Sequence, residues 1–170
     1  MQSNSTSLRS SPVQDYLKHL HQEFSGLVDG KVATYIPELP KANTECFGVC
    51  LVTLNGAVYE AGDSRQEFTI QSISKPFVYG LALEDHGRSD VLARVGLEPT
   101  GDAFNSISLD PATGRPRNPM INAGAIATTA LIQGKSAETR FRRVMEMFEL
   151  YAGRKLALDD KVYRSESETG

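Results

Sequence analysis

The chain has 170 residues, of which 40% are hydrophobic and 23% charged, with a formal net charge of −3. This length and composition are those of one soluble globular domain or of part of a larger one. The weak negative charge gives no reason to expect nucleic acid or an anionic membrane as a partner, and no run approaches the roughly 18 apolar residues of a membrane span.

The N-terminal third begins with a helix signal. Residues 1–11 lack the apolar core of a signal peptide, so we expect a short disordered lead and a cytoplasmic protein. Ser11-Pro-Val-Gln14 has the serine, proline and glutamine of a helix start, and apolar residues at helical spacing extend this helix to about Leu27. Residues 30–40 contain two prolines and predict an irregular link, in which Tyr35 taken alone is a packing residue.

A β-hairpin is the clearest structural signal. Two β-rich runs, 46–54 and 57–61, flank Asn55-Gly56, which is the strongest short hairpin sequence. The first run is almost wholly apolar, so we expect it to be covered on both faces. Cys46 and Cys50 lie too far apart on a strand to bridge, and we expect both to be reduced core residues. The three histidines show no ligand spacing, and neither a metal nor another cofactor is predicted.

A Ser-x-x-Lys pair follows the hairpin. Pro76 is tolerated only in the first turn of a helix, so a helix running to about Asp85 must start close to Ser72. Lys75 then lies one turn further along the same face, near the free N–H groups of the helix end. A hydroxyl, an amine and amide donors at one place are what a serine acyl-transfer enzyme needs. Taken alone, the pair is a weak signal, because Ser and Lys are common, and the alternative is an N-capping serine with a solvated lysine.

The remainder of the chain is mainly helical. The pattern predicts a short helix over 89–95, a buried helix rich in small residues over 123–132, and a last, amphipathic helix between Ser136 and Gly153. Residues 96–119 are rich in turn formers, and so long a loop is usually functional or a binding wall. Residues 156–163 are expected to be a connector.

Strands and helices are therefore segregated, which predicts an α+β fold and argues against a doubly wound parallel sheet. A two-stranded hairpin is not stable by itself, and no good strand pattern follows residue 70. We therefore expect residues 12–170 to be the N-terminal portion of a domain that is incomplete at its C-terminus.

Four segments together indicate a family. They are Tyr35-Ile-Pro-Glu-Leu39, Gln71-Ser-Ile-Ser-Lys-Pro76, Asn118-Pro-Met-Ile-Asn-Ala-Gly-Ala-Ile126 and Val162-Tyr-Arg-Ser-Glu-Ser-Glu-Thr-Gly170. In this order and at these spacings the chain resembles the glutaminases, which belong to the serine-dependent superfamily of β-lactamases and penicillin-binding proteins. The similarity covers about residues 12–170, and it implies a β-lactamase/transpeptidase-like fold of helices with the first hairpin of an antiparallel sheet.

The resemblance implies hydrolysis of L-glutamine to L-glutamate and ammonia through an acyl-enzyme. Ser72 would be the nucleophile, Lys75 its base and Tyr35 a hydrogen-bonding group near the reacting amide. Asn122 and Glu166 would bind the polar groups of the amino acid. Glutaminases tend to form homotetramers, and they continue with further motifs that supply a second catalytic tyrosine and half of the oxyanion hole. This chain alone is therefore expected to be weakly active or inactive.

Other interpretations remain open at this stage. Asn122 directly precedes a predicted helix and could be its N-cap, Glu166 could be an ordinary exposed acid, and Gln71 could line the pocket or only carry backbone beside the nucleophile. A β-lactamase or penicillin-binding protein is a second possible function, but the Ser-x-Asn and Lys-Thr-Gly motifs of those enzymes are absent. A non-catalytic assembly module is a third.

Overall fold

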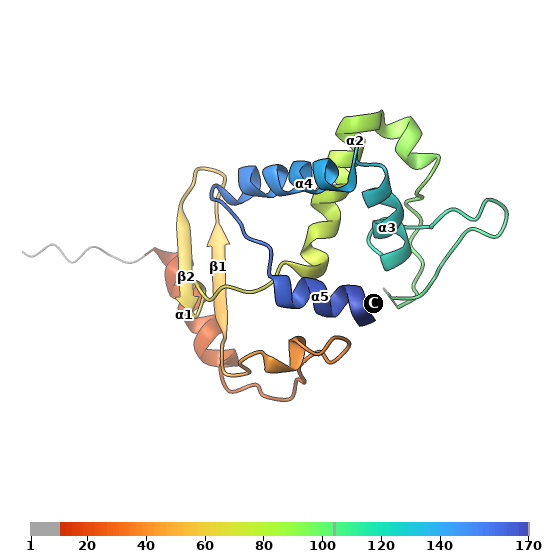
Figure 1. Ribbon diagram of the computed structural model, residues 1–170. Helices are drawn as coiled ribbons and strands as arrows, with labels where there is room; N and C mark the ends of the chain where they lie inside the picture. The colour runs from red at the N-terminus through yellow and green to blue at the C-terminus, as the bar shows by residue number, and fades with distance from the viewer. Residues whose placement is uncertain (1–10, 104, 170) are drawn as a thin grey trace, which may run out of the picture. The chain divides into compact units, whose positions relative to one another are not determined.

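The computed structural model describes residues 11–103 and 105–169, which form five α-helices and one hairpin. The chain divides into two compact units (Figure 1). The first contains the N-terminal residues up to Thr69 together with residues 159–170, and the second spans Ile70–Leu158. The lead predicted over residues 1–11 lies outside the described residues except for Ser11.

The first unit is built on helix α1 (Pro12–Phe24), which begins at the predicted proline. Its Leu17 is buried, and two of its polar side chains fasten it to the hairpin. The Gln14 side chain donates to the carbonyl of Glu60 at 2.7 Å and accepts from the N–H of Glu60 at 3.3 Å. His21 stacks on the ring of Phe47. The predicted packing helix is confirmed, although it ends three residues before Leu27.

The predicted hairpin is also confirmed. Strands β1 (Gly48–Val52) and β2 (Val58–Gly62) pair antiparallel, with Gly48 opposite Gly62 and Val52 opposite Val58. The connecting turn contains Asn55-Gly56, and the Gly56 φ of 83° is in the left-handed region that glycine adopts without a Cβ clash.

The expected burial of β1 is wrong for the described residues. Val52 is 64% exposed and Leu51 is also exposed. Cys46 and Cys50 are free thiols, as predicted, but both are exposed rather than in a core. Successive side chains of a strand point to opposite faces, so the exposure of both Leu51 and Val52 shows that the described residues cover neither face at this end of β1.

The remaining residues of this unit form loop and one late helix. Residues 25–47 are irregular apart from a 3₁₀ turn at Leu39–Lys41, as the two prolines predict. The predicted connector over 156–163 is wrong in its second half, because helix α5 (Asp160–Thr169) begins within it. The side chain of Asp159 caps α5, since its carboxylate accepts from the N–H groups of Lys161 and Val162 at 3.0 and 3.1 Å.

The second unit begins with the Ser-x-x-Lys segment. A 3₁₀ turn, Gln71–Ile73, runs directly into helix α2 (Ser74–Leu92). Gly87 interrupts α2 with a φ of 76°, so the helical conformation stops there and resumes at once. The two helices that the sequence predicts, one to about Asp85 and one over 89–95, are therefore the two sides of this break.

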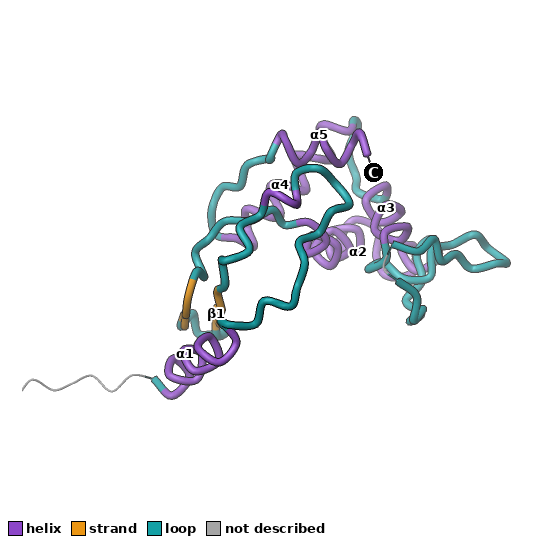
Figure 2. The backbone as a smooth tube through the Cα atoms, turned by 90° about the horizontal axis from the view of Figure 1, so that it is seen from below, coloured by secondary structure: helices purple, strands orange, loops and turns teal. Residues whose placement is uncertain are grey.

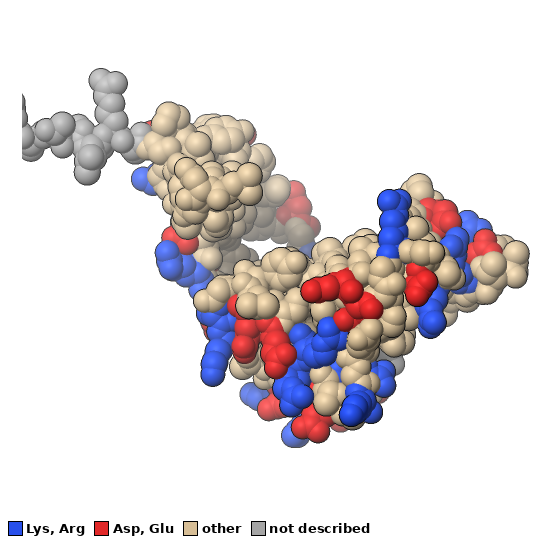
Figure 3. All heavy atoms as spheres, turned by 90° about the horizontal axis from the view of Figure 1, so that it is seen from above, with Lys and Arg blue, Asp and Glu red and all other residues tan. Residues whose placement is uncertain are grey.

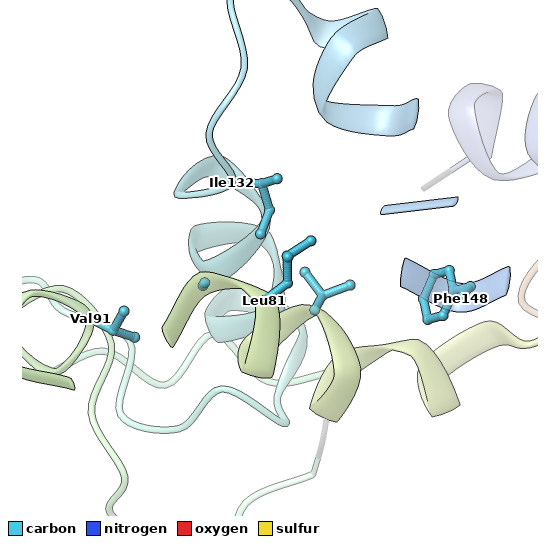
Figure 4. Packing of buried hydrophobic residues seen from close by; sticks show 6 residues of the cluster. Leu81, Val91, Ile132 and Phe148 are labelled. Atoms are coloured by element: carbon cyan, nitrogen blue, oxygen red, sulfur yellow. The ribbon is translucent and has the colours of Figure 1, made fainter. Parts of the chain in front are cut away.

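The core of the second unit lies between α2 and the helices that follow it (Figure 4). Its buried members are Val78, Leu81, Ala82, Val91, Ile132 and Phe148. The ring of Phe77 packs edge-on against Phe148 at its margin, with centroids 6.1 Å apart. This packing fixes α2 and therefore the turn that begins it.

Helix α3 (Asn122–Ala130) runs parallel to α2. Contacts pair the start of α2 with the start of α3 through Lys75 and Asn122, and the later part of α2 with the residues after α3 through Asp85 and Gln133. Parallel neighbours need a long return connection, and Figure 2 shows the described residues between α2 and α3, 93–103 and 105–121, as loop. The predicted burial of this helix is confirmed on one side only, since Gly124 is buried but Ile126 is 72% exposed.

Helix α4 (Ala137–Ala152) has the predicted ends: Ser136 and Thr139 form a reciprocal capping box, and Gly153 terminates it with a φ of 64°. An ion pair fastens α4 to α2, because Arg143 donates to both carboxylate oxygens of Asp85 at 2.6 and 2.7 Å.

On the face that Figure 3 shows, basic and acidic side chains are interspersed rather than gathered by sign. None of the helices in the described part of the chain has the length and apolar character that a bilayer crossing requires.

Candidate active site

Ser72 lies in the 3₁₀ turn that precedes α2, so the predicted helix start is correct to within two residues. Its side chain is exposed. The preceding residue, Gln71, has a φ of 43°, which is uncommon for a residue with a side chain and costs on the order of 1 kcal/mol or more. The surrounding contacts of the turn must hold this conformation, and they thereby fix the direction of the serine.

Ser74 supplies one of those contacts. Its hydroxyl donates to the carbonyl of Gln71 at 2.7 Å. This bond connects the first residue of α2 to Gln71, so the Ser74 hydroxyl stabilises the turn. Of the two serines in the motif, Ser72 is thus the one with an exposed side chain.

Lys75 reaches across to the segment before α3. Its amine donates to the side-chain oxygen of Asn122 at 2.7 Å and to the backbone carbonyl of Met120 at 3.0 Å. Lys75 is half-buried, and burial lowers its pKa below the ordinary value because the charged form loses hydration. A lysine in this environment gives up its proton more readily than a solvated one, which excludes the interpretation of Lys75 as a freely solvated side chain.

Asn122 is not the cap of α3. Ile121 occupies the N-cap position, and Asn122 is the first helical residue. The side-chain oxygen that a cap would use is instead bonded to Lys75. The helix-cap alternative for Asn122 is therefore wrong, and the structure brings Lys75 and Asn122 together.

Tyr35 and Glu166 belong to the other unit. Tyr35 lies in the irregular segment and is 56% exposed, and Glu166 is exposed on α5. Their assigned roles stay predictions, as does the role of the Gln71 side chain in lining a pocket.

The hollow lined by residues 60–66 contains none of the predicted site residues. Within the described ranges, no group of three His, Cys, Asp or Glu side chains could hold a metal ion.

The carbonyl of Met120 is the part of the site that sequence reasoning missed. A backbone acceptor leaves no residue-type signal, but Asn118-Pro119 directly before it is a turn signal. The Asn118 side chain accepts from the N–H of Met120 at 2.8 Å, which closes that turn.

The segregated arrangement of five helices and one antiparallel hairpin is that of the β-lactamase-like fold, which the similar solved structures share. The family profile described as "Glutaminase" matches residues 30–170. The chain belongs to the glutaminase family.

Similar proteins agree with this family. A glutaminase of Trichormus variabilis is 56% identical over 96% of the chain and 49% of its own length, and glutaminase 2 of Bradyrhizobium diazoefficiens is 50% identical over 94% of the chain and 25% of its own length. The crystal structure of Mglu in its glutamate form superposes with a TM-score of 0.86 at 45% identity, covering 94% of this chain and 37% of that one.

A further solved structure is a probable glutaminase from Bacillus subtilis complexed with 6-diazo-5-oxo-L-norleucine. It superposes with a TM-score of 0.81 at 30% identity, covering 99% of this chain and 51% of that one. The chain spans about half the length, or less, of the curated relatives that it matches.

Proposed function

We propose that this chain supplies the nucleophile and the base of an enzyme that hydrolyses L-glutamine to L-glutamate and ammonia. The observation that carries the proposal is the environment of Lys75, whose amine is half-buried and held by two oxygen atoms close to the exposed Ser72 in the chain. The glutaminase names of the relatives support the reaction, and the glutamate and 6-diazo-5-oxo-L-norleucine of the solved structures support the substrate.

In the proposed first half-reaction, neutral Lys75 takes the proton of the Ser72 hydroxyl as its oxygen attacks the side-chain amide carbon of glutamine. The carbonyl oxygen becomes an oxyanion, and the backbone N–H of Ser72 can donate to it. The C–N bond then breaks, the nitrogen takes the proton from Lys75, and ammonia leaves. A glutamyl ester on Ser72 remains.

In the second half-reaction, water attacks the ester carbon while Lys75 accepts one of its protons. Release of L-glutamate returns that proton to Ser72, so the enzyme is unchanged after each cycle. The lowered pKa of Lys75 suits both steps, because a base must be neutral near the operating pH to accept a proton.

Recognition of free glutamine requires groups for its ammonium and its carboxylate. We assign the ammonium to the carboxylate of Glu166, and we assign Asn122, which has both an amide donor and an acceptor, to a polar group of the substrate. Tyr35 is assigned to the region of the reacting amide and Gln71 to the wall beside Ser72. A homotetramer remains a prediction from the family resemblance, and a cytoplasmic location remains a prediction from the N-terminal sequence.

The experiment that tests this function uses 6-diazo-5-oxo-L-norleucine, a reactive glutamine mimic. In the full-length protein, we expect one label per chain on the peptide that contains Ser72, with parallel loss of ammonia release from glutamine. The Ser72→Ala variant should take up no label. A label on a peptide without Ser72, or a folded protein that releases no ammonia, would contradict the proposal; the second result would favour a non-catalytic assembly module.

Glu166→Gln tests substrate recognition. Replacing a carboxylate with a neutral amide removes a charge-assisted hydrogen bond to the substrate ammonium, so we expect KM for glutamine to rise about 10- to 100-fold. The fall in kcat should be much smaller. Steady-state ammonia release measures both constants. Glu168→Gln, which makes the same change two residues further along α5, is the matched control and should leave KM unaltered. Equal KM values for wild type and Glu166→Gln would remove Glu166 from the substrate site.

A further inference from the structure

Both of the described acceptors of the Lys75 amine lie on the short segment that leads into α3. They are the backbone carbonyl of Met120 and the side-chain oxygen of Asn122. The two contacts span 45 and 47 residues of sequence. The position of this segment therefore decides where the amine of Lys75 points.

Asn118 holds the segment from both sides. Its side-chain oxygen accepts from the N–H of Met120 at 2.8 Å, and its side-chain nitrogen donates to the carbonyl of Glu98 at 3.3 Å. The N–H of Glu98 in turn donates to the carbonyl of Arg117 at 2.9 Å. Asn118 thus joins the turn that carries Met120 to a neighbouring part of the same loop, without contacting Lys75 in any described bond.

Two further features remove freedom from this turn. Pro119 is buried and has a fixed φ. Gly124, in the first turn of α3, lies so close to the backbone of Asn118 that a Cβ there would overlap the carbonyl of Asn118. The turn and the start of α3 are therefore packed backbone against backbone.

We propose that Asn118 is a positioning residue that orients the Lys75 amine for proton transfer; this inference rests on the proposed function. A neutral amine has two N–H bonds and one lone pair in a tetrahedral arrangement. Met120 and Asn122 can each accept one of these N–H bonds, so the position of the turn sets how the amine is oriented. The Asn118 turn is therefore the part of the chain through which the orientation of the Lys75 amine is controlled.

The test is Asn118→Ala in the full-length protein. Loss of both Asn118 bonds releases the turn, and a misplacement on the order of 1 Å costs about 100-fold in rate, so we expect kcat to fall about 10- to 100-fold. KM should change less than about threefold, because Lys75 and Asn122 are both retained. The acid limb of the pH profile of kcat/KM should move to higher pH, since an opened turn admits water to the amine and its pKa returns toward the ordinary value.

Asn118→Asp is the conservative partner. It retains the acceptor for the Met120 N–H and loses the donor to Glu98, so it should recover most of kcat. Its acid limb should stay at higher pH than that of the wild type, because the new carboxylate favours the charged form of Lys75. Asn43→Ala is the matched control, because Asn43 makes the same kind of bond to a backbone N–H two residues later, that of Glu45 at 3.0 Å. It should leave kcat and the pH profile unchanged. If Asn118→Ala does not fold, Gly124→Ala takes its place, because a Cβ at that position displaces the same turn from α3. The kcat and the acid limb of Gly124→Ala are then compared with those of Asn118→Asp.

Different results would contradict the positioning role of Asn118 and the proposed function. If Lys75→Ala abolishes turnover while folded Asn118→Ala keeps the wild-type kcat and acid limb, the positioning role is wrong and the proposed function stands. If Lys75→Ala itself retains turnover, the proposed function is wrong and the role of Asn118 falls with it. A fall in kcat with an unmoved acid limb and no recovery in Asn118→Asp would show a structural effect and also overturn the positioning role.

Discussion

Ser72→Ala in the full-length protein is expected to lower kcat/KM for glutamine hydrolysis by about 10⁴-fold or more, because the proposed acyl-enzyme forms on the hydroxyl that this change removes. The thermal midpoint should stay nearly unchanged, since the side chain is exposed and its loss leaves no buried gap. Ammonia release and thermal unfolding are the two measurements. Turnover retained by this variant would refute the nucleophile assignment.

Lys75 should be equally sensitive, and two replacements separate its possible roles. Lys75→Ala removes both base and charge. Lys75→Arg keeps a cation that cannot become neutral near physiological pH, so it should be as inactive as the alanine variant if Lys75 acts as a base. An active arginine variant would show that positive charge, rather than proton transfer, is what matters.

Ser74→Ala is the control within the same motif. The Ser74 hydroxyl is bonded to the carbonyl of Gln71, so its loss should weaken the turn slightly, by about 1 kcal/mol, while most of the activity remains. A Ser74→Ala variant as inactive as Ser72→Ala would reopen the choice between the two serines.

The second large effect is expected at Asp85 and concerns stability. The Asp85 side chain is 4% exposed and accepts from Arg143 and from the backbone N–H of Gln133, so it joins α2, the residues after α3, and α4. Asp85→Ala removes the acceptor of the Gln133 N–H and leaves Arg143 with its bond to the carbonyl of Gln133 at 3.0 Å. Because Arg143 is 35% exposed and can partly rehydrate, we expect a loss of about 2 to 4 kcal/mol rather than the upper limit for a buried pair. Urea unfolding of the full-length protein measures it.

The stability that Asp85 contributes should decrease as the pH falls. The hydrogen bonds from Arg143 lower the pKa of Asp85. Its contribution is therefore complete above the unfolded-state pKa of about 3.9 and is lost as the pH falls through the lower folded-state pKa. The stability difference between wild type and Asp85→Ala should be full at neutral pH and shrink in strong acid. Asp85→Asn, which keeps the shape and one acceptor, should lie between them. A difference that is constant with pH would contradict the ionic origin.

Local signals predicted the elements whose ends are set by their own residues. Asn55-Gly56 fixed the hairpin because Gly56 adopts a positive φ, and Ser136 with Gly153 bounded α4 because both ends are satisfied by local hydrogen bonds or conformation. The start of α2 followed from Pro76 for the same reason. Such features depend on few neighbours, and periodicity together with capping chemistry is sufficient to place them.

Burial could not be predicted in the same way. Cys46 and Cys50 were expected in a core because their run is apolar, yet exposure depends on what covers a strand, which the strand does not encode. The connector expected over residues 156–163 is replaced in its second half by the start of helix α5, because the side chain of Asp159 caps that helix.

In the candidate site, too, local spacing was predictable and long-range contacts were not. The Ser-x-x-Lys spacing predicted Ser72 and Lys75 on one helical face, but not which groups would hold the amine. Asn122 had a local interpretation as a helix cap, and only the long-range packing of α3 beside α2 shows that its oxygen serves Lys75 instead. A backbone carbonyl such as that of Met120 carries no side-chain signature at all.

The parallel pairing of α2 and α3 has a consequence for synthesis of the protein. Asn122 is 47 residues later than Lys75 in the chain, which at about 5 to 20 residues per second corresponds to a delay of roughly 2 to 10 seconds. During that interval Lys75 has no partner segment, remains hydrated and keeps a pKa near 10.4. The Lys75 of a nascent chain therefore lacks the burial that lowers its pKa, and it acquires this burial only when the later half of the unit folds onto it.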